Sequence, residues 1–136
     1  MRIYLDSSAI VKRSIVEQDS EALRVALRHA HGHGARLLTS ALARVEVSRT
    51  LRTLLDSAPV AQLAVAGERA MSGIDEADLT RPVLHSARII GPPALWTLDA
   101  IHLATAIALG VDELWTYDRR MAAIAEQLGL VVVAPR

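Results

Sequence analysis

Two acidic residues in the last third of the chain stand beside apolar sequence, where a carboxylate is costly unless it is paired. Asp99 lies in the first turn of a predicted helix, residues 98–109, in which nearly every other position is apolar. A helix that is apolar on most faces is a buried helix. Gly110 ends it, and a short predicted strand, residues 113–117, leads to a second acid, Asp118. Asp99 therefore needs a partner or a metal ion, which Asp118 could share.

Two further acids occupy comparable places earlier in the chain, and each has two interpretations. Asp6 follows a short apolar strand and precedes a helical pattern. It is either an N-cap, which is the simpler interpretation, or an acid at the carboxyl end of a strand, where open α/β sheets bind ligands. Glu46 borders the apolar stripe of a predicted helix over residues 41–55. It either pairs with Arg49 on the surface or faces the same pocket, and the pattern leaves both open.

Four carboxylates in one cleft repel one another, so as a set they require shared protons or a hard cation. Oxygen ligands alone select Mg²⁺ or Mn²⁺ over zinc. Such a cation activates a water molecule and neutralises charge on a phosphodiester, which is the chemistry of a metal-dependent nuclease. The hydroxyls of Thr116 and Ser8 could contact that water. The predicted metal ligands are Asp6, Glu46, Asp99 and Asp118.

The order of the predicted elements explains how these acids would meet. Strands separated by helices indicate a short parallel sheet covered on both faces, a three-layer α/β/α sandwich. Strands that end at Asp6 and Asp118 then run in the same direction, and Glu46 and Asp99 enter near helix N-termini at that edge. Strands are predicted at residues 2–5, 36–39, 113–117 and 130–133, with 74–79 as an edge strand or loop. Helices are predicted from residue 9 and at 21–30, 41–55, 59–71, 82–90, 98–109 and 119–128.

Length and composition restrict the class of protein. The 136 residues suit a single domain, residues 1–136, and 51% of them are hydrophobic. Cysteine is absent, which excludes disulfides and thiolate metal sites. No apolar run approaches the ~20 residues of a membrane span and no signal peptide is visible, so we expect a cytoplasmic protein without membrane contact. The net charge is zero, yet every cation except Lys12 is an arginine, the side chain that best grips phosphate.

Four segments resemble the motifs of the PIN-domain ribonucleases, and most of all those of the VapC toxins of bacterial toxin–antitoxin pairs. The segments are Ile3–Ala9, Leu42–Val47, Leu98–Ala106 and Thr116–Met121. Each is short, but their order and spacing together are specific, and the resemblance extends over nearly the whole chain.

The resemblance implies a Mg²⁺-dependent endoribonuclease, a dimer that a small VapB-type antitoxin neutralises by covering the active site with its tail. The family's supporting hydroxyl corresponds to Thr116. Its acidic residues correspond to Asp6, Glu46, Asp99 and Asp118. The fourth acid varies in its role within the family, so direct metal binding by Asp118 stays open. Asp112 fits less well, because it precedes the strand.

Other classes fit the chain less well. A phosphatase with an Asp nucleophile would need a second Asp where Ser8 stands, and a receiver domain would need a late lysine, whereas the only lysine is Lys12. The chain has no Gly-rich phosphate-binding loop, which argues against an NTPase. The remaining alternative is a non-catalytic PIN-like module that binds RNA or a partner protein. His102, on the helical face of Asp99, fits either view as an orienting or core residue.

Cations and apolar helices indicate how partners would bind. Arg119 and Arg120 follow the last acid directly, and Lys12 and Arg13 belong to the first helix, so we expect some of them to hold RNA phosphates. Alanine and leucine on several helices exceed what one core of this size requires. Exposed apolar helix faces mark interfaces, which predicts a homodimer.

Overall fold

Five strands form one parallel sheet in the middle of the molecule, in a computed structural model that describes residues 1–136. Their order across the sheet is β3-β2-β1-β4-β5. The strand that is first in sequence therefore lies at the centre, between β2 and β4. The strands are β1 (Arg2–Leu5), β2 (Arg36–Ser40), β3 (Asp75–Ala77), β4 (Glu113–Trp115) and β5 (Val132–Val133).

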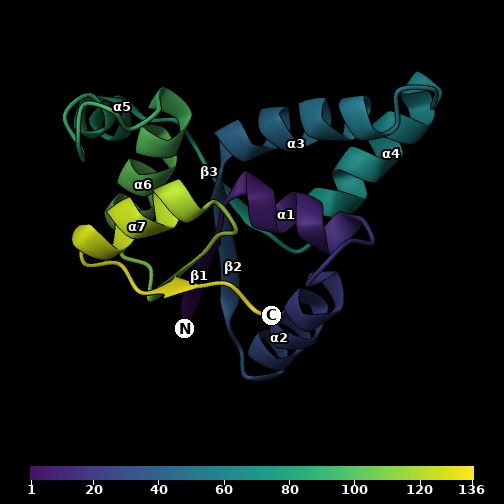
Figure 1. The fold of residues 1–136 in the computed structure, drawn as a ribbon, viewed down its shortest axis with the longest axis horizontal. Helices are drawn as coiled ribbons and strands as arrows, with labels where there is room; N and C mark the ends of the chain where they lie inside the picture. The colour runs from purple at the N-terminus through teal and green to yellow at the C-terminus, as the bar shows by residue number, and fades with distance from the viewer.

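Seven helices cover the two faces of this sheet. One group is α1 (Ser7–Ser14), α2 (Ser20–Gly32), α3 (Ala41–Leu54) and α4 (Val60–Met71). The other is α5 (Arg81–Ala87), α6 (Thr97–Leu109) and α7 (Arg119–Gln127). Figure 1 shows the two groups on opposite sides of the strands, which confirms the predicted three-layer α/β/α arrangement. None of the helices has the length and apolar character needed to cross a membrane.

The side chains of β1 contribute to a hydrophobic core on each face of the sheet, because successive side chains of a strand point to opposite sides. Ile3 and Leu5 belong to the larger core, which the first helix group covers. Tyr4, between them, belongs to the smaller core with Leu103 of α6 and Met121 of α7. The centre of the sheet is therefore buried on both faces, and only the ends of its strands reach a surface where a ligand could bind.

Most boundaries follow the capping residues of the sequence. The side chains of Asp6, Ser40 and Thr80 each accept a hydrogen bond from the first turn of a helix, and Gly110 ends α6 in the left-handed conformation with φ 58°. The strand predicted to reach residue 117 ends at Trp115, because the next amides, of Tyr117 and Asp118, donate to side-chain hydroxyls and not to a neighbouring strand. The helices predicted at 59–71 and 82–90 run over Val60–Met71 and Arg81–Ala87, and the segment 74–79 forms the short strand β3.

Candidate active site

Asp6 lies at the carboxyl end of the central strand and is almost fully buried. Its Oδ1 accepts hydrogen bonds from the Ser8 hydroxyl at 2.7 Å and the Ala9 amide at 2.9 Å, and its Oδ2 accepts one from the Thr116 hydroxyl at 2.7 Å. Burial raises the pKa of Asp6, and these donors lower it by a smaller amount. Asp6 thus caps α1 and is at the same time held against the end of β4.

The hydroxyls of Ser8 and Thr116 join the ends of β1 and β4. Each hydroxyl has a single proton, which it donates to Asp6, and each accepts a hydrogen bond from the loop that follows β4. The Tyr117 amide donates to Ser8 at 2.9 Å, and the Asp118 amide donates to Thr116 at 3.0 Å. Because both protons are directed at Asp6, the two hydroxyls orient this carboxylate.

Glu46, on α3, faces α6. Its Oε2 lies 2.6 Å from Nε2 of His102, and Nδ1 of the same ring lies 2.7 Å from the hydroxyl of Tyr4. Burial raises the pKa of Tyr4, so the phenol keeps its proton and donates it to Nδ1, which makes Nε2 the donor to Glu46. This buried chain of hydrogen bonds fixes the carboxylate. Glu46 does not form the alternative surface pair with Arg49. His102 orients Glu46 through a hydrogen bond and is not simply a core residue.

Asp99 is the third residue of α6, and its carboxylate accepts no hydrogen bond within the chain. The N-cap of the helix is Trp96, so Asp99 is not a cap. The carboxylate is half-buried. Burial is the largest cause that raises the pKa of Asp99, followed by the charge of Asp118, with smaller contributions from Asp6 and Glu46. The sequence predicted a pairing group or a metal ion for Asp99, and no other side chain of this protein pairs with its carboxylate.

Asp118 is the N-cap of α7, and its charge acts on Asp99. Its Oδ1 accepts the backbone amides of Arg120 at 2.8 Å and Met121 at 3.0 Å, which leaves Oδ2 free of hydrogen bonds. Asp112, the weaker alternative, accepts a hydrogen bond from the backbone amide that begins β1 and so lies at the opposite edge of the sheet.

The four acids come from four different helices or strand ends and gather at one edge of the sheet. None of them forms an ion pair with lysine or arginine. Their charges act on one another over distances longer than ligand bonds, and no three Asp, Glu or His side chains stand close enough to make a ready-made metal site. Negative charge is thus concentrated here without a direct ion pair to lysine or arginine.

The cations predicted to hold RNA fall into two groups. Lys12 forms an ion pair with an acid of the following turn, and Arg13 donates to a backbone carbonyl after α4, so both are engaged within the chain. Arg119 and Arg120 are exposed and pair with no acid. The guanidinium of Arg120 lies 4.2 Å from the centre of the Trp96 ring. Positive charge without an acidic partner therefore follows Asp118, at the beginning of α7.

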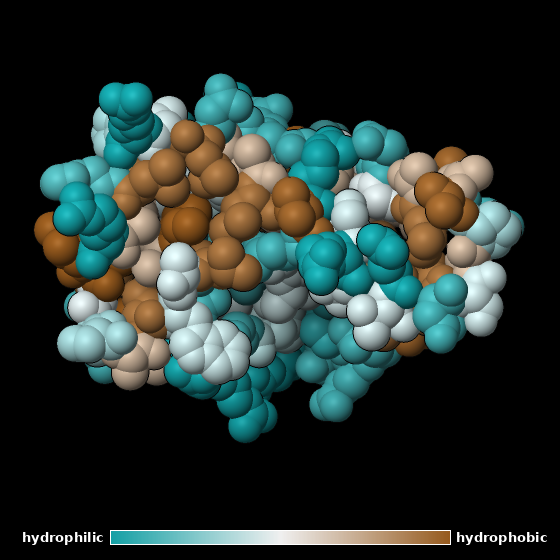
Figure 2. Space-filling model, turned by 90° about the horizontal axis from the view of Figure 1, so that it is seen from above, coloured by the Kyte–Doolittle hydropathy of each residue, from teal (hydrophilic) through white to brown (hydrophobic).

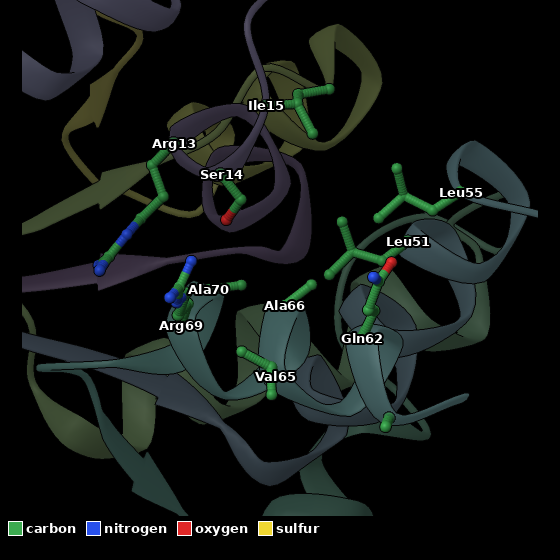
Figure 3. Close-up of a pocket in the computed structure, with 11 residues that line it drawn as sticks. Arg13, Ser14, Ile15, Leu51, Leu55, Gln62, Val65, Ala66, Arg69 and Ala70 are labelled. Carbon is green, nitrogen blue, oxygen red and sulfur yellow. The ribbon is translucent and has the colours of Figure 1, made fainter. Parts of the chain in front are cut away.

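A separate hollow lies between α1, α3 and α4 (Figure 3). It has a volume of about 710 Å³ and is mainly apolar, with Leu51, Val65 and Ala66 in its wall and Arg13 and Arg69 at one end. No acidic residue lines it, so it is not part of the carboxylate site.

Comparison with known proteins identifies the family. The model of the PIN domain matches residues 3–127, which is most of the chain. The chain belongs to the PIN-domain family. This PIN domain is 49% identical over 135 residues to Ribonuclease VapC46 of Mycobacterium tuberculosis, covering 98% of this chain and 97% of that protein. It is 38% identical over 140 residues to Ribonuclease VapC47 of the same species, covering 98% and 96%. It is therefore a PIN domain of the VapC ribonuclease type.

Solved structures agree on the fold of this PIN domain. The crystal structure of VapBC2 from Rickettsia felis, bound to a DNA fragment from its promoter, gives a TM-score of 0.73 at 12% identity and covers 100% of both chains. The crystal structure of Mycobacterium tuberculosis VapC20, a sarcin–ricin loop cleaving toxin, gives 0.72 at 15% identity and covers 98% and 99%. At these identities the likeness concerns the fold alone.

Two aromatic residues of this PIN domain, Tyr4 and Trp96, were not predicted from the sequence to belong to the surroundings of the acids. Tyr4 belongs to a short apolar strand. Its hydroxyl could have indicated a buried hydrogen bond, because a buried tyrosine usually has a hydrogen-bond partner. Trp96 stood three residues before Asp99 with no pattern around it. Its position becomes informative only when Arg120 is seen against its ring.

Proposed function

We propose that this VapC-type ribonuclease is an endoribonuclease that hydrolyses RNA with Mg²⁺, or Mn²⁺, at its cluster of carboxylates. The proposed metal ligands are Asp6, Glu46, Asp99 and Asp118. On this proposal residues 1–136 form one nuclease domain, which acts in the cytoplasm as the toxin of a type II toxin–antitoxin pair.

The observation that carries the proposal is the state of Asp99. Its carboxylate is half-buried, accepts no hydrogen bond and lies within the field of three further acids. None of the four carboxylates forms an ion pair with lysine or arginine. Acids in this arrangement are stable as a set when protons or a cation from outside the chain join them.

The donor set fits a hard divalent cation. The available atoms are carboxylate oxygens, which Mg²⁺ and Mn²⁺ prefer, and the chain has no cysteine. The one imidazole nearby, His102, directs Nε2 at Glu46 and Nδ1 at Tyr4, so neither nitrogen is free to bind metal. When bound, the cation would activate water and neutralise the charge that develops on the phosphodiester.

The residues of the chain supply the positioning that this chemistry needs. Ser8 and Thr116 hold both oxygens of Asp6, and His102 holds Glu46. Asp118 uses one carboxylate oxygen to cap α7 and keeps the other free. The site therefore combines fixed carboxylates with freer ones that can adjust to a cation.

RNA would approach along the beginning of α7. Arg119 and Arg120 are exposed, form no ion pair and directly follow Asp118. Their guanidinium groups would hold phosphates on either side of the bond that is cut, and this binding should weaken as salt rises. Lys12 pairs with an acid and Arg13 is half-buried, so both would contribute less.

Two protein partners complete the proposal. A VapB-type antitoxin is supported by the likeness to the VapBC2 complex. A homodimer is supported by exposed apolar side chains on and beside α5 and α6, including Leu84, Ile89 and Leu98. Figure 2 shows apolar surface gathered over that end of the molecule.

The test is RNA cleavage by the purified protein. Total cellular RNA is incubated with Mg²⁺, with Mn²⁺ or with EDTA, and the 5′ ends of the products are mapped. We expect internal cuts with either cation and intact RNA with EDTA. Cleavage that EDTA leaves unchanged would contradict the proposal. RNA that is bound but never cut would instead indicate the non-catalytic module.

A further inference from the structure

The surface beside the carboxylates carries an aromatic ring that the fold does not use. Trp96 is 62% exposed, whereas the other tryptophan of the chain, Trp115, is 4% exposed. Trp96 occupies the N-cap position of α6, yet its side chain makes no capping hydrogen bond. Tryptophan is seldom left so exposed, because its ring is the largest apolar surface among the side chains.

Arg120 holds this ring in place. Its guanidinium lies over the Trp96 ring at 4.2 Å from the centroid, and its Nη2 donates to the backbone carbonyl of Ala94 at 3.5 Å. A cation over one face of an indole is a specific attraction, and it leaves the remaining exposed surface of the ring open. The pair thus forms a stacked, positively charged platform whose parts come from α6 and α7.

The position of the platform ties it to the acids. Trp96 is the N-cap of α6 and Asp99 is the third residue of the same helix, so both belong to its first turn. Arg120 follows the N-cap of α7, Asp118, by two residues. The platform therefore starts from the same two helix ends as Asp99 and Asp118, and Arg119 adds a second cation without an acidic partner.

We infer that Trp96 and Arg120 form a stacking site for a nucleobase of single-stranded RNA next to the phosphate that is cut. The inference rests on the proposed nuclease function and deepens it. Aromatic rings and guanidinium planes are the groups on which proteins stack unpaired bases, and neighbouring cations hold the backbone. A base in a duplex is already paired and stacked, so the site selects unpaired segments and is tolerant of sequence.

The two tryptophans make a direct test possible, because acrylamide reaches an exposed indole and not a buried one. Short oligoadenylate is titrated into the protein in EDTA, so that the RNA stays intact. We expect the acrylamide-accessible tryptophan emission to fall and to become protected. The same oligoadenylate annealed to oligouridylate should change the emission much less.

Substitutions separate stacking from other effects. Trp96→Leu should weaken the affinity for labelled oligoadenylate about tenfold, measured by fluorescence anisotropy. Trp96→Phe retains an aromatic face and should stay within about threefold of the parent. Ile107→Ser removes an exposed apolar side chain from the far end of the same helix and should leave affinity unchanged. Melting curves establish that each variant is folded.

Several outcomes would overturn the inference. One is parental affinity of Trp96→Leu for single-stranded RNA. Another is a Trp96 ring that acrylamide cannot reach in the free protein, which would place it in an interface between copies. A third is emission that responds to a protein partner but not to RNA. If the parent binds single-stranded RNA through Trp96 but leaves it intact in Mg²⁺, the proposed nuclease function is wrong and the stacking site stands. If the parent cleaves RNA but Trp96→Leu binds it with parental affinity, the stacking site is wrong and the nuclease function stands.

Discussion

Asp99 is the candidate ligand that nothing in the chain holds, so its replacement separates charge from structure. Asp99→Asn removes one charge from a crowded set, and we expect a metal-free Tm at least equal to that of the parent. The gain in Tm that Mg²⁺ gives should shrink, and RNA cleavage should fall by orders of magnitude. The measurements are melting curves with and without Mg²⁺ beside a cleavage assay.

The control for this variant is Asp56→Asn, which removes the same charge from the exposed turn after α3. It should leave both cleavage and the response to Mg²⁺ at the parental level. An Asp99→Asn protein that cuts RNA at the parental rate would remove Asp99 from the site.

The raised pKa of Asp99 predicts a pH-dependent stability difference. In an unfolded chain an aspartate titrates near pH ~3.9, so above that pH the folded state binds more protons than the unfolded state. The ionised group therefore lowers the free energy of unfolding at neutral pH, and this loss disappears as the pH falls towards ~4. Without metal, the Tm advantage of Asp99→Asn should be largest near neutrality and vanish on acidification. A difference that is independent of pH would argue against the shift.

Tyr4 tests the hydrogen bonds that orient Glu46. Tyr4→Phe leaves Nδ1 of His102 buried without its donor, and we expect the free energy of unfolding to fall by about 1–2 kcal/mol. Tyr117→Phe is the matched control, because the carbonyl that its hydroxyl contacts lies nearer the surface and can be hydrated. Its loss should be smaller in the same denaturant titration. If Tyr4→Phe and Tyr117→Phe lose the same free energy of unfolding, burial of the hydrogen bond between Tyr4 and His102 adds nothing to its contribution.

At the scale of elements, Asp118 caps α7 and is also one of the proposed metal ligands. Asp118→Asn keeps an N-cap of equal quality and relieves the repulsion with Asp99, so the metal-free Tm should not fall, whereas Asp118→Ala should lose about 1 kcal/mol of capping stability. Both variants lose a carboxylate, and both should cleave RNA far more slowly than the parent. Parental cleavage by Asp118→Asn would reduce this acid to a helix cap.

The helix ends and the order of the strands were predictable from the sequence, whereas the contacts between distant elements were not. Caps at Asp6 and Ser40 and the stop at Gly110 located helix ends, because these signals are local. The parallel sheet and its common edge followed from the alternation of strands and helices. The contact between Glu46 and His102 did not, because helical spacing gives the face of a residue and not the element that packs against it.

At the scale of the whole molecule, the exposed apolar surface near α5 predicts association. We expect the parent to sediment as a dimer at micromolar concentration. Ile89, which is 80% exposed, is the side chain to test. Ile89→Lys should shift the protein towards the monomer without lowering its Tm at low concentration. A parental protein that sediments as a monomer would contradict the dimer.

The central position of β1 has a consequence for how the protein folds. One of its two neighbours in the sheet is β4, and the Asp6 carboxylate at the end of β1 accepts a hydrogen bond from Thr116, 110 residues further along the chain. Until β4 pairs with it, one edge of β1 has no partner. Asp6 and Asp118 therefore come together only after a long-range pairing of parallel strands, a step that is slow because the intervening chain must first be ordered.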